Sequence, residues 1–181
     1  MLAYHGTTRE HAINILANGN KTTATWHCSD DAYLYLWCPD VLIKNRECEK
    51  EDSGAMAIQF AFESSQITAA MSENMQKELI VLCFDFPENL IELDESCENM
   101  ELSRRICLQD YTKYYKTSFV AKHNPRLDAF VLSGLLDNQY LNFYTLDDDL
   151  LQAAKTLKDQ YIDSLMEFDY QEKDITKELT K

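Results

Sequence analysis

The stretch E-L-I-V-L-C-F-D-F (residues 78–86) is the strongest fold signal in the chain. It is rich in aliphatic and aromatic residues, contains no glycine or proline, and is followed at once by Pro87. Such an uninterrupted apolar run, ended by a residue that cannot donate to a sheet ladder, predicts a central β-strand.

Shorter signals surround this strand. Further strands are predicted at residues 2–4, 22–28, 90–93, 128–134 and 139–146. Helices are predicted after residues 7–10, a T-x-x-E capping box, and at residues 32–37, 54–71 and about 150–165. Gly19 is expected to end the first helix, and Pro39 to stop the second. Strands and helices mixed without regular alternation favour an α+β fold over a doubly wound sheet.

The intervening segments are read as irregular. Residues 45–53 are expected to form a loop, residues 94–101 an acidic solvated loop, and residues 103–118 an excursion with a short helix. The tail from Glu167 is read as a last helical turn or a frayed end. With 181 residues and no repeat or linker, the chain is expected to form a single domain over residues 1–181.

Composition limits the classes of function. The net charge of −14 disfavours casual binding to phosphate backbones. No run approaches a membrane span and no signal peptide is visible, so we expect a cytoplasmic protein that does not contact a membrane. The six cysteines show no C-x-x-C pair or finger-like spacing, so no metal site is expected.

Basic side chains are clustered in one part of this acidic sequence, and two interpretations are open. They comprise Arg104, Arg105, Lys113, Lys116, Lys122 and Arg126. They form either a local patch that guides a nucleic acid or a set of solvated loop charges.

The most informative chemistry is in Y-H-G-T-T (residues 4–8). A histidine at the end of a strand can point into a cleft, and a glycine leaves its backbone open to a ligand. The helix start that follows favours anions. His5 and Gly6 therefore form either a binding corner or a tight turn with a hydrogen-bonded histidine.

This segment, with A-I-N-I-L-A-N-G (residues 12–19), resembles the opening of the ADP-ribosyltransferases of the poly(ADP-ribose) polymerase and diphtheria-toxin type. The resemblance implies a split mixed or antiparallel β-sheet core with flanking helices. It also implies that NAD+ is the substrate, with His5 bonding a ribose hydroxyl and the Gly6 backbone bonding the nicotinamide amide. Thr7 lies next to this pair.

T-W-H-C-S-D-D-A-Y (residues 25–33) is similar to the second element of that family. The likeness implies that Trp26 stacks on the nicotinamide, that Ser29 begins a helix, and that Tyr33 is a further stacking residue. The family usually has tyrosine where this chain has Trp26, with glycines before it. The alternative is that Trp26 is an ordinary core aromatic.

The family's third element is a late strand that opens with a catalytic glutamate, and L-D-N-Q-Y-L-N-F-Y-T-L (residues 136–146) resembles it. Gln139 stands at the position of the glutamate. Glutamine can hydrogen-bond a hydroxyl but cannot act as a general base. Glu63 is the best substitute carboxylate, the alternative being a solvated helix residue.

Together these features predict an NAD+-dependent mono-ADP-ribosyltransferase that uses no metal. The expected acceptor is a macromolecule, with protein favoured over RNA or DNA. A toxin, effector or phage-defence role, with an antitoxin or other inhibitory protein as partner, is implied by analogy alone. The rival hypotheses are a non-catalytic module that binds NAD or ADP-ribose, and a purely protein-binding domain.

Overall fold

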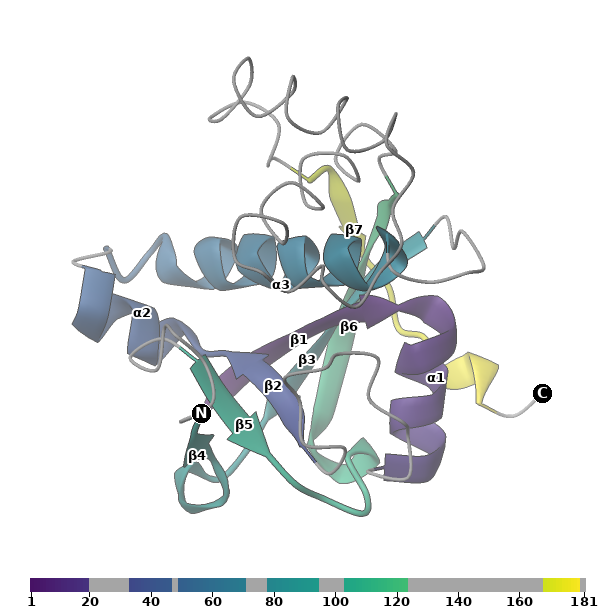
Figure 1. Cartoon of the computed structure of the whole chain (residues 1–181), viewed down its shortest axis with the longest axis horizontal. Helices are drawn as coiled ribbons and strands as arrows, with labels where there is room; N and C mark the ends of the chain where they lie inside the picture. Colours follow the sequence, from purple (N-terminus) through teal and green to yellow (C-terminus); the bar gives the residue numbers. More distant parts are fainter. Residues whose placement is uncertain (20–32, 47–48, 71–77, 95–102, 124–167, 180–181) are drawn as a thin grey trace, which may run out of the picture.

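A computed structural model describes residues 1–19, 33–46, 49–70, 78–94, 103–123 and 168–179. Within these ranges an open antiparallel sheet of seven strands forms the centre, in the order β4-β5-β2-β1-β3-β6-β7 (Figure 1). The strands are β1 (Leu2–Thr8), β2 (Leu34–Trp37), β3 (Glu78–Asp85), β4 (Glu92–Leu93), β5 (Ser103–Ile106), β6 (Tyr115–Lys122) and β7 (Tyr170–Glu172). The prediction of a mixed α+β fold is confirmed at this level.

Strand β3 confirms the prediction made from residues 78–86. It pairs with β1 on one side and β6 on the other, and its register with β1 runs from Leu2↔Asp85 to Thr8↔Leu79. Ile80, Leu82 and Phe84 enter one hydrophobic core, whereas Leu79, Val81 and Cys83 enter another. Because successive side chains point to opposite faces, a strand buried on both faces reads as a continuous apolar run.

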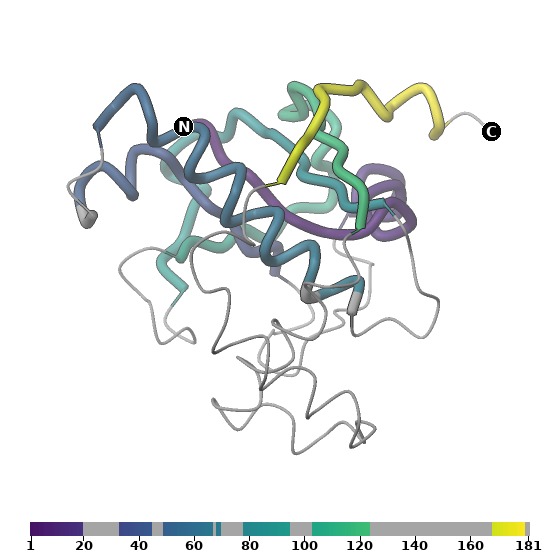
Figure 2. The backbone as a smooth tube through the Cα atoms, turned by 90° about the horizontal axis from the view of Figure 1, so that it is seen from above, coloured from purple at the N-terminus to yellow at the C-terminus, as the bar shows by residue number. Residues whose placement is uncertain are grey.

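Helices cover both faces of the sheet. Helix α1 (Arg9–Asn18) packs Ala12, Ile15 and Leu16 into the core that contains Leu82, and we call this side the α1 face. Helix α3 (Ser53–Ala70) packs on the opposite side, the α3 face, in the core that contains Val81. Figure 2 shows α3 lying along β1.

Two helix predictions are confirmed. Helix α3 reproduces the helix expected at residues 54–71 to within one residue at each end. Gly19 ends α1 with a φ of 60°, and its N–H bonds the carbonyl oxygen of Ile15. A residue with a Cβ adopts this left-handed conformation at a cost, which explains the glycine.

The helix expected at residues 32–37 is wrong for Leu34–Trp37, which form strand β2. Leu34 and Leu36 are buried and Tyr35 and Trp37 are half-buried, so the burial has the period of two typical of a strand. Pro39 does not stop a helix but begins α2 (Pro39–Arg46), a position where its missing N–H costs nothing.

The region after β3 also differs from expectation. The excursion expected at residues 103–118 contains β5 and the start of β6, separated by a short 3-10 helix, η3 (Thr112–Tyr114). Of the residues expected to form a strand at 90–93, only Glu92–Leu93 belong to one, after the 3-10 helix η2 (Glu88–Leu90). Asp94 is buried rather than solvated, and Ser103 Oγ donates to its carboxylate at 3.0 Å.

The predicted strands at residues 22–28, 128–134 and 139–146, and the helix at about 150–165, lie outside the described residues. The described part of the polar tail is not a frayed end, and its helical turn is a short 3-10 helix that follows a strand. Residues 168–179, here named the C-terminal strap, contribute β7 at the edge of the sheet and a 3-10 helix, η5 (Thr176–Glu178).

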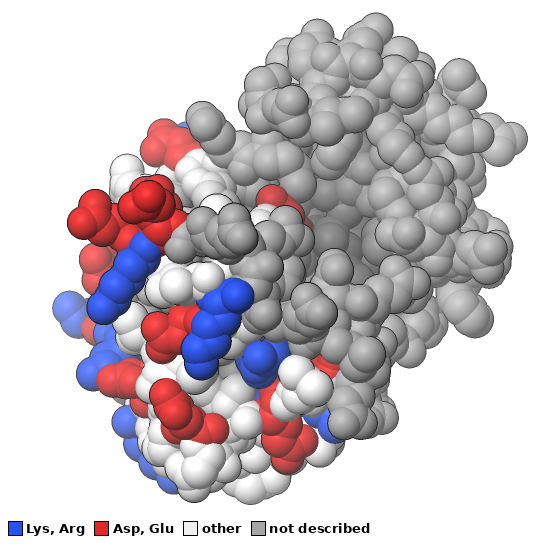
Figure 3. All heavy atoms as spheres, turned by 90° about the vertical axis from the view of Figure 1, so that its left-hand side faces the viewer, with Lys and Arg blue, Asp and Glu red and all other residues white. Residues whose placement is uncertain are grey.

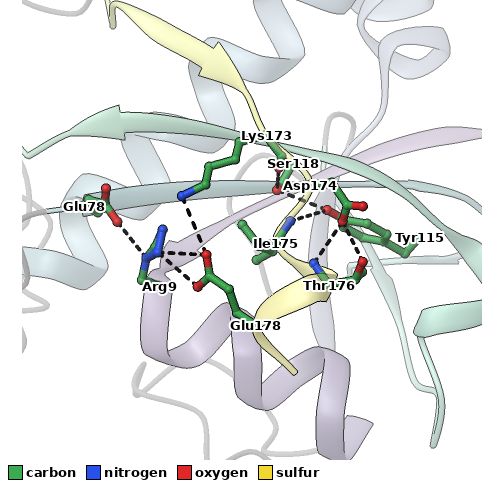
Figure 4. Close-up of polar contacts among 9 residues, drawn as sticks. All are labelled: Arg9, Glu78, Tyr115, Ser118, Lys173, Asp174, Ile175, Thr176 and Glu178. Atoms are coloured by element: carbon green, nitrogen blue, oxygen red, sulfur yellow. Dashed lines mark hydrogen bonds and ion pairs between the residues drawn. The ribbon is translucent and has the colours of Figure 1, made fainter. Parts of the chain in front are cut away.

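The C-terminal strap is anchored to both ends of the central strands (Figure 4). Arg9, the first residue of α1, bonds Glu78 from Nε at 2.7 Å and Glu178 from Nη1 at 3.0 Å. Ile175 is fully buried in the core of the α1 face, and its N–H donates to Tyr115 Oη at 3.3 Å. The strap is therefore part of the folded core.

Replacement of Ile175 by alanine is expected to lower the free energy of unfolding by about 2–4 kcal/mol, because it leaves a cavity in the core. Urea denaturation followed by circular dichroism measures this loss. The control is Glu172→Ala, an exposed change in the same strap that is expected to cost less than about 0.5 kcal/mol. Equal effects of the two substitutions would show that the strap does not pack as described.

Candidate functional site

His5 and Gly6 lie inside a strand rather than at its end. Strand β1 continues to Thr8, and α1 begins at Arg9. The expected capping box is therefore wrong, because Thr7 belongs to the strand and Thr8, the residue before the helix, makes no side-chain cap hydrogen bond. The expected corner between a strand and a helix is therefore not at His5 and Gly6, because residues 4–8 all belong to β1.

The His5 side chain of β1 is bonded to the backbone of β2. These two strands are joined through the pair Tyr4↔Trp37. Beyond that pair, His5 Nδ1 lies 2.8 Å from the carbonyl oxygen of Tyr35 on β2. A carbonyl only accepts hydrogen bonds, so Nδ1 carries the proton and, in the neutral ring, Nε2 is left as an acceptor. The hydrogen-bonded histidine of the alternative interpretation is present, but the tight turn is not.

The charge state of His5 follows from its surroundings. The pKa of His5 is lowered from 6.5 to about 4, chiefly by burial; the bond to the Tyr35 carbonyl opposes this shift, and the nearby His11 adds to it. A neutral ring at pH 7 suits Nε2 to accept a hydrogen bond from a ligand hydroxyl.

This pKa predicts a pH dependence of stability. The unfolded chain protonates His5 near pH 6.5 and the folded chain only near pH 4, so stability present above pH 6.5 is lost as the pH falls toward 4. At pH 4.5 the folded state should have lost about 2 kcal/mol through this group. The measurement is urea denaturation of the parent and His5→Gln at pH 7 and pH 4.5. A loss of stability of the same size in both proteins would contradict the assignment.

Gly6 is explained by the packing of α3. A Cβ at this position would lie 1.6 Å from the carbonyl oxygen of Ala61 and 3.0 Å from the nitrogen of Ser65. Ser65 Oγ also donates to the carbonyl oxygen of Thr7, which ties the helix to the strand. The absent side chain therefore gives room to a helix backbone, and α3 covers this side of Gly6.

Thr7 and Glu63 lie on different sides of the sheet. His5 and Thr7 are opposite Leu82 and Ile80 in the register of β1 with β3, so their side chains share the α1 face. Glu63 is on α3, beside Ser64, whose Oγ accepts from Trp37 Nε1 at 3.1 Å. The structure brings Thr7 beside His5 and does not bring Glu63 to that face.

Tyr33 comes directly before β2, and the guanidinium carbon of Arg105 lies 4.2 Å from the centre of its ring. The other three predicted site residues, Trp26, Ser29 and Gln139, lie outside the described residues. The sequence reasoning missed the Tyr35 carbonyl, because a backbone acceptor has no signature in the side-chain pattern and because β2 was read as helix.

Comparisons of the chain with protein-family models, with curated proteins and with solved structures find no match. Within the described ranges, no group of three or more His, Cys, Asp or Glu side chains is placed to hold a metal ion. No helix in that part of the chain is long and apolar enough to cross a membrane.

Proposed function

We propose that the chain is an NAD+-dependent mono-ADP-ribosyltransferase. The observation that carries the proposal is the His5 ring of β1, bonded through Nδ1 to the Tyr35 carbonyl of β2. Its pKa of about 4 keeps Nε2 an acceptor at neutral pH, as the recognition of a ribose hydroxyl requires. The likeness of residues 4–19 to the opening of known ADP-ribosyltransferases supplies the identity of the ligand.

In this reaction the bond between nicotinamide nitrogen and ribose C1′ breaks, and its electron pair leaves with neutral nicotinamide. A nucleophile of the acceptor then bonds C1′ and gives its proton to solvent. Trp26 and Tyr33 would clamp the nicotinamide, and Thr7 and Ser29 would flank the ligand. The cationic ribose would be stabilised by the oxygen of Gln139.

Gln139 is preferred to Glu63 for this last role. Helix α3, which carries Glu63, covers the face of the sheet opposite to the His5 side chain. Without a general base, transfer must rely on electrostatic stabilisation and on an acceptor that is already nucleophilic.

A protein acceptor is favoured over RNA or DNA. The net charge of the chain is −14, and on the face drawn in Figure 3 basic and acidic side chains are interspersed. Lys116 lies 3.7 Å from Asp85, and the Lys113 ammonium lies 4.8 Å from the centre of the Tyr114 ring. The net negative charge of the chain also suits a basic inhibitory partner, as a cytoplasmic toxin or effector would need.

The test is mass spectrometry of a cell lysate incubated with the protein and NAD+. We expect ADP-ribose attached to protein. If ADP-ribose were found on RNA or DNA instead, the proposed acceptor would be wrong but the proposed enzymatic activity would stand.

Two other results would contradict the proposal that the chain is an enzyme. Binding of NAD+ without transfer or hydrolysis would support a non-catalytic module, which glutamine at position 139 favours. No affinity for NAD+ would support a protein-binding domain.

A further inference from the structure

Arg105 has an unusual environment for an arginine. It lies on β5, opposite Tyr35 of β2 on one side and Glu92 of β4 on the other. Its guanidinium carbon lies 4.2 Å from the centre of the Tyr33 ring, and its side chain is only 19% exposed. The charged group is thus held against an aromatic platform and largely removed from water.

One donor of this guanidinium, the N–H at Nε, has no hydrogen-bond acceptor among the described residues. This Nε atom is also buried. The Glu92 carboxylate is 3.5 Å from Nε and is itself 56% exposed, which makes a weak ion pair. A buried donor without an acceptor costs free energy, which a ligand that offers oxygen atoms to this guanidinium would recover.

Two other arginines have a different environment. Arg104, the preceding residue, donates from Nη1 to the carbonyl oxygen of Ser103 at 2.8 Å. Arg9 is held by two carboxylates, those of Glu78 and Glu178. Among these three, Arg105 alone has a buried donor without an acceptor in the described part of the chain.

We propose that Arg105, stacked on Tyr33, is a binding site for a phosphate group. The planar guanidinium fork matches two oxygens of a phosphate, and the stacked ring fixes its plane. Glu92 is the competing internal anion, which a bound phosphate displaces. The proposal stands on the contacts of Arg105 and does not depend on the proposed function. A dinucleotide and a free phosphate compound offer the same chemistry.

The test is calorimetric titration at low ionic strength with inorganic pyrophosphate and, separately, with NAD+. Arg105→Gln should weaken binding at least tenfold, and Arg105→Lys should give an intermediate loss because it keeps the charge but not the fork. Arg104→Gln is the matched control and should change the affinity less than twofold. Affinity for pyrophosphate indicates a free phosphate ligand, and affinity for NAD+ alone indicates the phosphate of a dinucleotide.

Glu92→Gln should change the affinity in the opposite direction from Arg105→Gln. Because Glu92 is exposed, its substitution is not expected to impair folding. Removing the competing carboxylate should strengthen binding about threefold or more. The proposal is overturned if neither probe binds at millimolar concentration, if Arg105→Gln binds as the parent does while folded by circular dichroism, or if Glu92→Gln weakens binding.

Discussion

Gly6→Ala is expected to lower the free energy of unfolding by more than about 3 kcal/mol. The new Cβ would lie 1.6 Å from the Ala61 carbonyl oxygen. The obstacle is the backbone of α3, so no change of side-chain rotamer relieves the overlap, and the helix must move off β1. Thermal and urea denaturation measure the loss.

Gly54→Ala is the matched control. Gly54 lies in the first turn of α3, and a Cβ there meets nothing within 4 Å. Alanine is also the better helix former, so this change should stabilise the protein by about 0.5–1 kcal/mol. If Gly6→Ala were instead as stable as the parent and lost only affinity for NAD+, the glycine would serve the ligand rather than the helix.

The second large effect is expected at His5. His5→Ala should reduce affinity for NAD+, and any ADP-ribosyl transfer, by about 10- to 100-fold, because it removes the acceptor for the ribose hydroxyl. Equilibrium binding of NAD+ and the yield of labelled product measure the two losses. Far-UV circular dichroism confirms that the variant is folded.

His11→Gln serves as the control for this substitution. His11 is half-buried on α1 and lies close enough to His5 to influence its pKa, but it has no role in the proposed recognition of ribose. Its replacement should change NAD+ affinity less than twofold. Equal losses of NAD+ affinity in His5→Ala and His11→Gln would contradict a specific role of His5 in binding the ribose.

Strong local patterns carried most of the correct structural predictions. The run at residues 78–86 identified the strand between β1 and β6 because burial on both faces makes every position from 79 to 84 apolar. Helix α3 and the glycine that ends α1 were equally visible. The short strand β2 was misread because four residues give too little periodicity to outweigh acidic residues before it and Pro39 after it.

Other features depend on contacts between distant segments and leave no local trace. Ile175 is one of the few apolar residues in a polar tail, yet it fills the core beside α1. The reason for Gly6 lies in a helix more than fifty residues away, and the reason for the His5 tautomer lies in a carbonyl of β2. The sequence pattern singled out His5 and Gly6, but it did not indicate that α3 occupies the space beside Gly6.

The most direct test is a nitrogen NMR spectrum of the His5 imidazole, recorded at pH 7 with and without NAD+. We predict a neutral ring protonated at Nδ1, whose Nε2 resonance shifts when NAD+ is added because it accepts a hydrogen bond. A cationic ring, a ring protonated at Nε2, or an Nε2 resonance that saturating NAD+ leaves unchanged would contradict the proposed recognition of NAD+.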